Sequence, residues 1–265
     1  MSIIIIKNAE QIEGIRKSSK LAGKTLLYAE QFVKEGVTTE YIDDKIEEYI
    51  RDHGAIPAPL HYHGFPKSSC ISLNDTVCHG IPAKDTILKN HDIVNIDVTT
   101  ILEGYYGDTS KMYSVGEMSI IAKKLVVATK KCLDIGIGQC SSGNYFGNIG
   151  YHIANFAHSK GFSVVYEFTG HGTGLEFHEP PQVDHIARRN TGKIMKPGMI
   201  FTIEPMINQG KAKVTIDNHD GWTARTKDHK LSAQFEHTIL ITETGFDVLT
   251  DVSGEYNNPE KAYNY

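Results

Sequence analysis

The chain has 265 residues and is 40% hydrophobic, which suits one large domain with its own core or a fused duplication. Its formal net charge is −5, from 27 basic and 32 acidic residues, so the overall charge does not favour a nucleic acid or an anionic membrane as the main partner. The four cysteines form no CxxC pair and no stretch approaches membrane-spanning length, which argues against a disulfide framework, a sulfur-ligated structural zinc and a transmembrane helix. We therefore expect a cytoplasmic protein with no nucleic acid as substrate and no membrane partner.

The N-terminal part of the chain predicts a short segment followed by two helices. The apolar run within residues 1–7 is too short for a signal peptide, so it predicts a first strand or a packed arm. Asn8, followed three residues later by Gln11, forms a capping-box pattern that predicts the start of a long helix. A second, amphipathic helix is expected to begin after Thr38 and to stop at Gly54.

The segment 92–110 predicts two strands around a turn, with polar side chains on one face. A turn centred between Leu102 and Glu103 would place Asp97 directly opposite Asp108. Opposed side chains of an antiparallel pair lie about 5 Å apart at Cβ, and like charges there are destabilising. We expect a positive group between the two carboxylates; the alternative is a solvated hairpin with two surface acids.

The second part of the chain repeats the order of the first, which predicts a duplicated unit. Helices are expected from about Ser119 to Leu133 and from about Tyr145 to Ser159. Each part then offers a histidine, an acid in an apolar strand and a further acid: His79, Asp97 and Asp108, then His178, Glu204 and Glu236. We expect a single domain over residues 1–265, with halves of about 1–115 and 116–265 whose polar residues meet at the junction.

Glu204 and Glu236 occur where burial is expected. Glu204 follows the apolar run 199–203, and Glu236 precedes the strand-like segment 238–242. A buried carboxylate must be protonated, paired with a base or bound to a metal, because an isolated buried charge is too costly. Neither run contains a Lys or Arg, so four carboxylates and a histidine favour two divalent ions that share bridging acids. Salt bridges from elsewhere in the fold are the alternative.

Three histidines, His79, His171 and His178, occur at turns rich in glycine or proline. The glycines and prolines of segment 168–181 argue against a helix there and allow the backbone to approach a ligand closely. The segment contains neither GxGxxG nor GxxxxGK[ST], so it is not a nucleotide-binding loop of either kind. Beside buried acids, these histidines predict ligand or catalytic groups; a structural role is the alternative.

Short motifs spread along nearly the whole chain become specific when they are taken together. They are CIS at 70–72, VCHGIP at 77–82, NIDV at 95–98, GDTS at 107–110, GHGTG at 170–174, FHE at 177–179, TIEP at 202–205 and QFEHT at 234–238. The set resembles the type I methionine aminopeptidases, the short bacterial form of that family. The resemblance implies an α/β (α+β) pita-bread fold, a pseudo-two-fold duplicated unit with a central curved antiparallel sheet covered by helices.

The resemblance implies a catalytic domain that removes the initiator methionine from nascent proteins, using a hydroxide held between two divalent metal ions. The metal ligands would be Asp97 on one ion, His171 and Glu204 on the other, and Asp108 and Glu236 on both. These ligand types do not separate cobalt, manganese, iron and zinc. Relatives also bind a monovalent cation, which here would contact backbone near Asn74 and Ser232.

The resemblance also assigns roles to residues around the metals. Glu204 would accept a proton, His178 would stabilise the tetrahedral oxyanion, and His79 would contact the scissile amide or its leaving nitrogen or merely position the substrate. The walls of an apolar methionine pocket would be Tyr62, Phe65, Cys70, Phe177 and Trp222. Several relatives have tyrosine in place of Phe65, and a small or sulfur-containing residue is common at Pro59, so we expect a different pocket rim.

The expected partners are the N-termini of nascent polypeptides in which methionine precedes a small residue, with transient ribosome contact and a monomeric enzyme. Because Met1 is followed by the small Ser2, the protein is expected to process itself. One rival is an Xaa-Pro aminopeptidase or prolidase, which usually carries an extra N-terminal domain for which this chain has no room. The other is a catalytically dead binding module on the same fold, which would have lost ligands that this chain retains.

Overall fold

The computed structural model describes residues 3–256, which contain four α-helices and two short 3-10 helices. They are α1 Ala9–Ala29, η1 Glu30–Phe32, α2 Thr39–Asp52, η2 Tyr62–Gly64, α3 Ile120–Ile137 and α4 Phe146–Ser159. No helix in this range is long and apolar enough to cross a membrane. The expected self-processing between Met1 and Ser2 concerns residues outside the described range.

The starts of the helices follow the capping signals in the sequence. At α1 the Gln11 N–H donates to Asn8 Oδ1 at 2.9 Å, and the Asn8 N–H donates to Gln11 Oε1 at 3.0 Å, which completes the predicted capping box. Thr38 and Ser119 cap α2 and α3 by accepting from backbone N–H groups three residues later. The end of α3 lies four residues beyond the predicted Leu133.

Fifteen short strands connect and flank these helices in the described range, and every strand pair is antiparallel. The strands are β1 Ile56–Pro57, β2 Cys70–Leu73, β3 Thr76–Cys78, β4 Ile93–Leu102, β5 Tyr105–Ser114, β6 Ser163–Val164, β7 Gly170–Gly172, β8 Glu179–Val183, β9 Ile200–Ile203, β10 Met206–Asn208, β11 Val214–Ile216, β12 Ala224–Thr226, β13 Ser232–Gln234, β14 His237–Ile241 and β15 Phe246–Val248.

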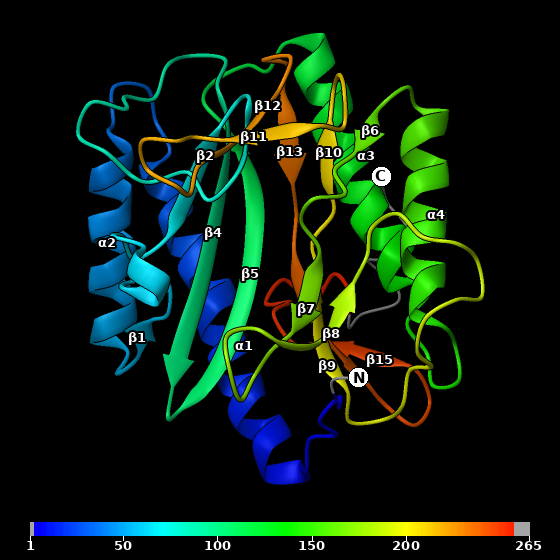
Figure 1. The fold of residues 1–265 in the computed structure, drawn as a ribbon. Coiled ribbons are helices and arrows are strands. Elements are labelled where there is room, and N and C mark those ends of the chain that lie inside the picture. Colours follow the sequence, from blue (N-terminus) through cyan, green and yellow to red (C-terminus); the bar gives the residue numbers. More distant parts are fainter. Residues whose placement is uncertain (1–2, 257–265) are drawn as a thin grey trace.

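The strands form four small sheets around the centre of the molecule. Their orders are β1-β4-β2 with β5 on β4, β13-β10-β6, β11-β12-β3, and β15-β14-β9-β7-β8. Helix α1 packs against β4 and β5, and α3 packs against β10 and β13, with α2 and α4 packed on α1 and α3 respectively (Figure 1). The helices therefore cover the sheets from two sides, one pair in each part of the chain.

Some backbone hydrogen bonds of the first part of the chain have an equivalent in the second part. The equivalent residues are separated by the same number of positions as Asp97 and Glu204. The Gly36 N–H donates to Leu88 O at 2.9 Å, and at the equivalent place the Gly143 N–H donates to Met195 O at 3.0 Å. Isolated β-bridges repeat in the same way, between Thr38 and Ile87 and between Tyr145 and Ile194. Each bridge holds the start of the second helix against the turn that precedes an acid-bearing strand.

The β4–β5 hairpin carries two of the expected site residues, and its register differs from the prediction. Asp108 lies opposite Thr99, not opposite Asp97. The turn residues Glu103 and Gly104 both have positive φ, 53° and 83°, which fits a two-residue turn that matches the twist of the strands. The turn is therefore centred one residue later than expected, and the two carboxylates are diagonal neighbours on the same face.

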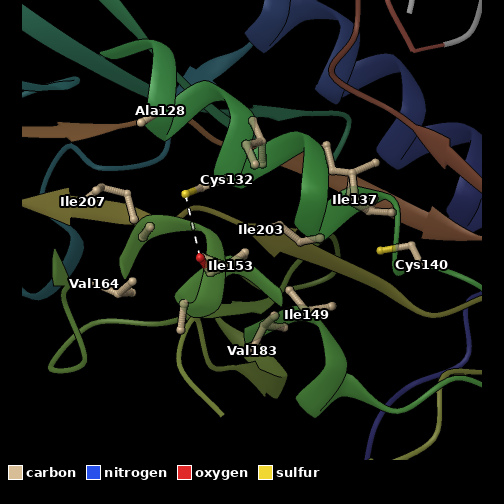
Figure 2. Packing of buried hydrophobic residues seen from close by; sticks show 14 of the residues in the cluster. Ala128, Cys132, Ile137, Cys140, Ile149, Ile153, Val164, Val183, Ile203 and Ile207 are labelled. Carbon is tan, nitrogen blue, oxygen red and sulfur yellow. Dashed lines mark hydrogen bonds between the residues drawn. The ribbon is translucent and has the colours of Figure 1, made fainter. Parts of the chain in front are cut away.

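The largest hydrophobic cluster lies between α3, α4 and the strands of the second part of the chain (Figure 2). The two helices approach closely at Gly136, where a Cβ would come within 2.8 Å of Ile153 Cδ1. Cys132 Sγ also faces α4, 4.0 Å from Ile153 O. All four cysteines are buried as free thiols, in agreement with the prediction that no disulfide is formed.

The described part of the N-terminal segment, residues 3–7, forms no strand and is anchored to the rest of the protein at Lys7. The Lys7 N–H donates to Gly198 O at 2.9 Å, and the Lys7 ammonium lies 2.8 Å from Glu179 Oε1 with neither side chain more than 4% exposed. Glu179 Oε1 also accepts the Leu175 N–H at 3.2 Å. This buried ion pair fixes the loop that ends in Phe177 and His178.

Breaking this pair should destabilise the protein strongly. Lys7→Met leaves the Glu179 carboxylate buried without its cation, a change that typically costs about 3–5 kcal/mol. The double variant with Glu179→Gln should recover much of that loss, because the amide oxygen still accepts the Leu175 N–H. Chemical denaturation measures both, with Arg51→Met in the exposed Arg51–Glu47 pair as the control, expected to cost less than about 1 kcal/mol. Equal losses in the single and double variants would contradict this account.

Candidate metal centre

The expected site residues line one cavity of about 440 Å³ between the two parts of the chain. All twelve residues predicted as ligands, catalytic groups or pocket walls contribute to it: Tyr62, Phe65, Cys70, His79, Asp97, Asp108, His171, Phe177, His178, Glu204, Trp222 and Glu236. None of the described residues that line the cavity is a Lys or Arg. A larger hollow of about 960 Å³ between α1 and α3 contains none of these twelve among its described residues.

The carboxylates reach the cavity from strands that are joined across the two parts of the chain. Asp97 and Asp108 lie on β4 and β5, Glu204 follows β9, and Glu236 immediately precedes β14. The Glu236 N–H donates to Ser110 O at 3.0 Å, and the Thr109 hydroxyl donates to Glu236 O at 2.7 Å. These bonds bring β5 beside Glu236 and therefore place acids from both parts in one cluster.

The electrostatics of the cluster are unfavourable for bare carboxylates. Burial raises the pKa of Asp97, Glu204 and Glu236 well above the ordinary range, and the charge of Asp108 adds to the effect on each. Burial raises the pKa of Asp108 to about 7, although the Thr99 hydroxyl donates to its Oδ1 at 2.7 Å. We expected a positive group between Asp97 and Asp108. No described side chain lining the cavity is a Lys or Arg that could supply it.

His171 completes the cluster, and its ring has the protonation that a metal ligand needs. Its Nδ1 lies 3.0 Å from Gly172 O, and because a carbonyl only accepts, Nδ1 carries the proton. The unprotonated Nε2 lies 3.6 Å from Asp108 Oδ2 and 3.5 Å from Glu204 Oε1. Burial lowers the pKa of His171 to about 3, so this lone pair is available at neutral pH.

Ligand atoms of Asp108, His171 and Glu236 all lie within 4.8 Å of one another, which is close enough to share a metal ion. The set consists of carboxylate oxygens with one imidazole nitrogen, donors suited to divalent first-row metals. The residues present therefore fit divalent metal binding.

Sequence reasoning missed several residues that hold the ligands in place. The Glu204 N–H donates to His185 Nε2 at 3.1 Å. The carboxylate of Glu204 accepts from the Thr202 hydroxyl at 2.8 Å and from the Gln234 side-chain amide at 3.3 Å. Glu204 lies beyond the end of β9 and before Pro205, so a side chain replaces the strand partner of its N–H. The contact of Thr202 could have been predicted from the sequence, because alternation places residues two apart on the same face of a strand. No pattern in the sequence indicates the contact of His185.

His79 and His178 both line the cavity that contains the carboxylate cluster. His79 has a positive φ of 56°, and its ring contacts Phe168 and Trp222 with centroids 5.3 and 6.0 Å away. The His178 ring lies 4.1 Å from that of His171, and its Nδ1 is 2.9 Å from the Tyr62 hydroxyl. Burial lowers the pKa of both His79 and His178 to about 4, so both rings are neutral at pH 7.

The expected pocket walls form an apolar end of the cavity. Phe65 is only 3% exposed and meets Trp222 edge to face, with centroids 5.3 Å apart. Cys70 is paired with Asp97 across β2 and β4, so the apolar wall adjoins the carboxylates directly. Pro59 also lines the cavity. Elsewhere, the Ser232 N–H donates to Asn74 O at 2.8 Å, so the two segments expected near a monovalent cation are adjacent.

Comparisons with known proteins decide the family. Residues 13–243 match Metallopeptidase family M24. The methionine aminopeptidase of Haemophilus influenzae is 50% identical over 249 residues, which cover 93% of this chain and 92% of that protein. The chain belongs to the methionine aminopeptidases of metallopeptidase family M24. The crystal structure of methionine aminopeptidase from Rickettsia prowazekii superposes with a TM-score of 0.93 at 47% identity, covering 94% of this chain and all of that one.

The family has the pita-bread fold, so the predicted fold class is confirmed. The prolidase of Pyrococcus horikoshii shares this fold, with a TM-score of 0.75, but at 23% identity the likeness shows the fold alone. The match covers 93% of this chain and only 63% of that prolidase. Methionine aminopeptidases, by contrast, match along nearly their whole length.

Replacing one carboxylate should stabilise the protein once its metal has been removed. In the folded state Asp108 has a pKa of about 7 against its ordinary 3.8. Between pH 3.8 and 7 the folded protein therefore binds more protons at Asp108 than the unfolded protein does. The free energy of unfolding consequently falls as the pH rises through this range. In chelated protein Asp108→Asn should therefore raise the free energy of unfolding at pH 8 by at least about 1 kcal/mol, and by less at pH 5.

Chemical denaturation at both pH values, with and without added manganese, measures this effect. Asp52→Asn, at the exposed end of α2, is the matched control and should change neither stability nor its metal response. Added metal should stabilise the unsubstituted protein and the control but not Asp108→Asn. If chelated Asp108→Asn protein were less stable at pH 8 than the chelated unsubstituted protein, the Asp108 carboxylate would not destabilise the folded state, and this account would be wrong.

Proposed function

We propose that this chain releases the initiator methionine of nascent polypeptides by hydrolysis, with two divalent metal ions at the carboxylate cluster. The observation that carries the proposal is the convergence of four carboxylates and the Nε2 lone pair of His171 beside an apolar pocket. Membership of a metallopeptidase family supports metal dependence. The number of ions and the choice among cobalt, manganese, iron and zinc belong to the proposal.

The proposed ligands divide between the two metal positions. Asp97 would hold one ion, and His171 and Glu204 would hold the other. Asp108 and Glu236 would contribute to both positions, which is consistent with their ligand atoms lying within 4.8 Å of one another and of His171. A monovalent cation bound by backbone near Asn74 and Ser232 is also part of the proposal.

In the proposed mechanism Glu204, His178 and His79 each transfer a proton, donate a hydrogen bond or contact the substrate. When bound, the metal pair supplies Lewis-acid activation of a water and of the scissile carbonyl. The Glu204 carboxylate accepts the proton that the attacking water releases. His178 donates to the carbonyl oxygen as it becomes negative, and His79 contacts the scissile amide nitrogen. Their neutral rings can donate without carrying a charge.

The apolar end of the cavity is proposed to hold the methionine side chain. Tyr62, Phe65, Cys70, Phe177 and Trp222 form its walls. A thioether is flexible and polarizable, so it fills an irregular aromatic pocket well. Because Cys70 is paired with Asp97, a side chain seated there places the adjacent α-amine and carbonyl beside the carboxylates.

The cellular setting completes the proposal. We propose a monomer of the cytoplasm that acts on chains in which methionine precedes a small residue and contacts the ribosome only transiently. No nucleic acid or membrane is part of this setting. We further propose that residues 1–265 form one catalytic domain of two halves, about 1–115 and 116–265, a division supported by the repeated hydrogen bonds of Gly36 and Gly143.

Methionine release tests the function directly. The protein should release methionine from Met-Ala-Ser, lose this activity with a chelator and regain it with manganese or cobalt. Asp108→Asn should lower kcat/KM by more than about 100-fold, since even groups that only orient metal ligands contribute 10- to 100-fold. Asp52→Asn should match the unsubstituted enzyme. Cleavage of Ala-Pro-Ser alone would favour the prolidase-like rival, and no turnover with any metal would favour a binding module.

His178→Ala tests the proposed oxyanion contact. Loss of one donor to a developing negative charge typically lowers kcat about 100- to 1000-fold, with a smaller effect on KM. Steady-state kinetics on Met-Ala-Ser measures the two constants separately. His158→Ala, on the exposed end of α4, is the control. A fall confined to KM would assign His178 to substrate binding instead.

A further inference from the structure

Tyr62 contacts His178 in two ways. Its hydroxyl lies 2.9 Å from His178 Nδ1, and the two rings stack at 29° with centroids 5.3 Å apart. Phe177 packs on the same Tyr62 ring, with centroids 4.7 Å apart. The hydroxyl therefore occupies Nδ1 and leaves Nε2 as the ring nitrogen of His178 that can donate to the substrate.

The loop around Tyr62 is strained and tightly bonded. His61 and His63, on either side, both have positive φ, 68° and 48°, a conformation that costs side-chain-bearing residues free energy. The His61 N–H donates to Phe65 O at 2.8 Å, and the Phe65 N–H donates to Tyr62 O at 2.9 Å. Such strain persists only where the surrounding contacts over-determine the backbone, so the position of the Tyr62 ring is well defined.

The direction of the hydrogen bond follows from proton counting. A neutral imidazole has one ring proton, and a phenol has one proton that it can donate. In the proposed function the ring proton of His178 donates to the substrate oxygen from Nε2, so Nδ1, which lies 2.9 Å from the Tyr62 hydroxyl, can only accept. The phenol therefore donates to Nδ1, and the ring proton of His178 is on Nε2.

The neighbouring histidine shows the opposite arrangement. His171 Nδ1 faces the Gly172 carbonyl, which only accepts, so its proton is on Nδ1 and its lone pair is on Nε2. The two rings are 4.1 Å apart. One ring thus offers a lone pair, as a metal ligand must, while the adjacent ring offers an N–H, as an oxyanion contact must.

We propose that Tyr62 is a positioning residue that holds His178 in the Nε2–H tautomer and fixes the direction of that N–H. This inference rests on the proposed function, in which His178 donates to the substrate carbonyl oxygen. It gives Tyr62 a role in the chemical step beyond its place in the pocket wall. Because Tyr62 acts through His178, loss of its hydroxyl should lower kcat more than it changes KM.

Two replacements at position 62 separate the hydroxyl from the ring. Tyr62→Phe keeps the ring and removes the donor, whereas O-methyltyrosine keeps an oxygen that only accepts and so favours the Nδ1–H tautomer. Tyr106→Phe is the matched control, because Tyr106 also stacks near Phe177, with centroids 6.1 Å apart, and its hydroxyl has no recorded hydrogen bond to a described residue.

Kinetics and nitrogen NMR read the result in the metal-loaded enzyme. With Met-Ala-Ser, Tyr62→Phe should lower kcat about 3- to 10-fold, as expected for one lost hydrogen bond, with KM changed less than about twofold. O-methyltyrosine should lower kcat further, and Tyr106→Phe should leave it unchanged. Long-range proton–nitrogen spectra of ¹⁵N-histidine protein, loaded with diamagnetic zinc and assigned with His178→Asn, should show Nε2–H in the unsubstituted enzyme and an Nδ1–H population with O-methyltyrosine.

The spectra report the tautomer whether or not the enzyme turns over, so failure of the positioning role is distinct from failure of the proposed function. The inference is overturned if His178 carries its proton on Nδ1 in the unsubstituted enzyme. It is also overturned if the Tyr62 variants lower only thermal stability or only raise KM, since a purely structural wall would do that.

Discussion

The repulsion among the four carboxylates that face the cavity is the constraint on which the rest of this structure depends. Asp108, Glu204 and Glu236 are each less than 10% exposed, and the described residues around them include no basic side chain except neutral histidines. Such a cluster requires protons or bound cations, because the charged forms lose their hydration without gaining a partner. The surrounding strands must therefore hold these oxygens at distances that a cation can bridge, against forces that would separate them.

The junction between the two parts of the chain meets this requirement. Backbone and hydroxyl groups of β5 bond to the residues around Glu236, and the Thr238 hydroxyl donates to Asp108 O at 2.7 Å. Asp108 and Glu236 are thus held through their own backbone, while hydroxyl and amide donors also orient the carboxylates of Asp108 and Glu204. A duplicated unit is suited to this arrangement, because each copy contributes an acid at the equivalent place, Asp97 in one and Glu204 in the other.

Much of this arrangement could be predicted from the sequence, and what could not has physical reasons. Capping residues such as Asn8 and Thr38 act locally, so the helix starts were correct. The hairpin register was wrong because Glu103 adopts a positive φ, which its residue type does not suggest. The acids Asp97, Asp108, Glu204 and Glu236 could be singled out because buried acids without bases are rare, and the structure brings all four to one cavity. His185 and the Tyr62 hydroxyl were missed because they act on their partners from distant segments, and no local pattern marks such contacts.

The ion pair between Lys7 and Glu179 has a consequence for how the protein is made. Lys7 leaves the ribosome early, whereas its partner is added 172 positions later, which at about 5–20 residues per second is a delay of roughly ten to thirty seconds. Throughout that interval Lys7 lacks the partner that it has in the folded protein, and the loop of Phe177 and His178 does not yet exist. The segment of Lys7 is thus synthesised well before the loop that it helps to hold, so an enzyme that acts on emerging chains acquires its own finished active site only after residues as late as Glu236 have emerged.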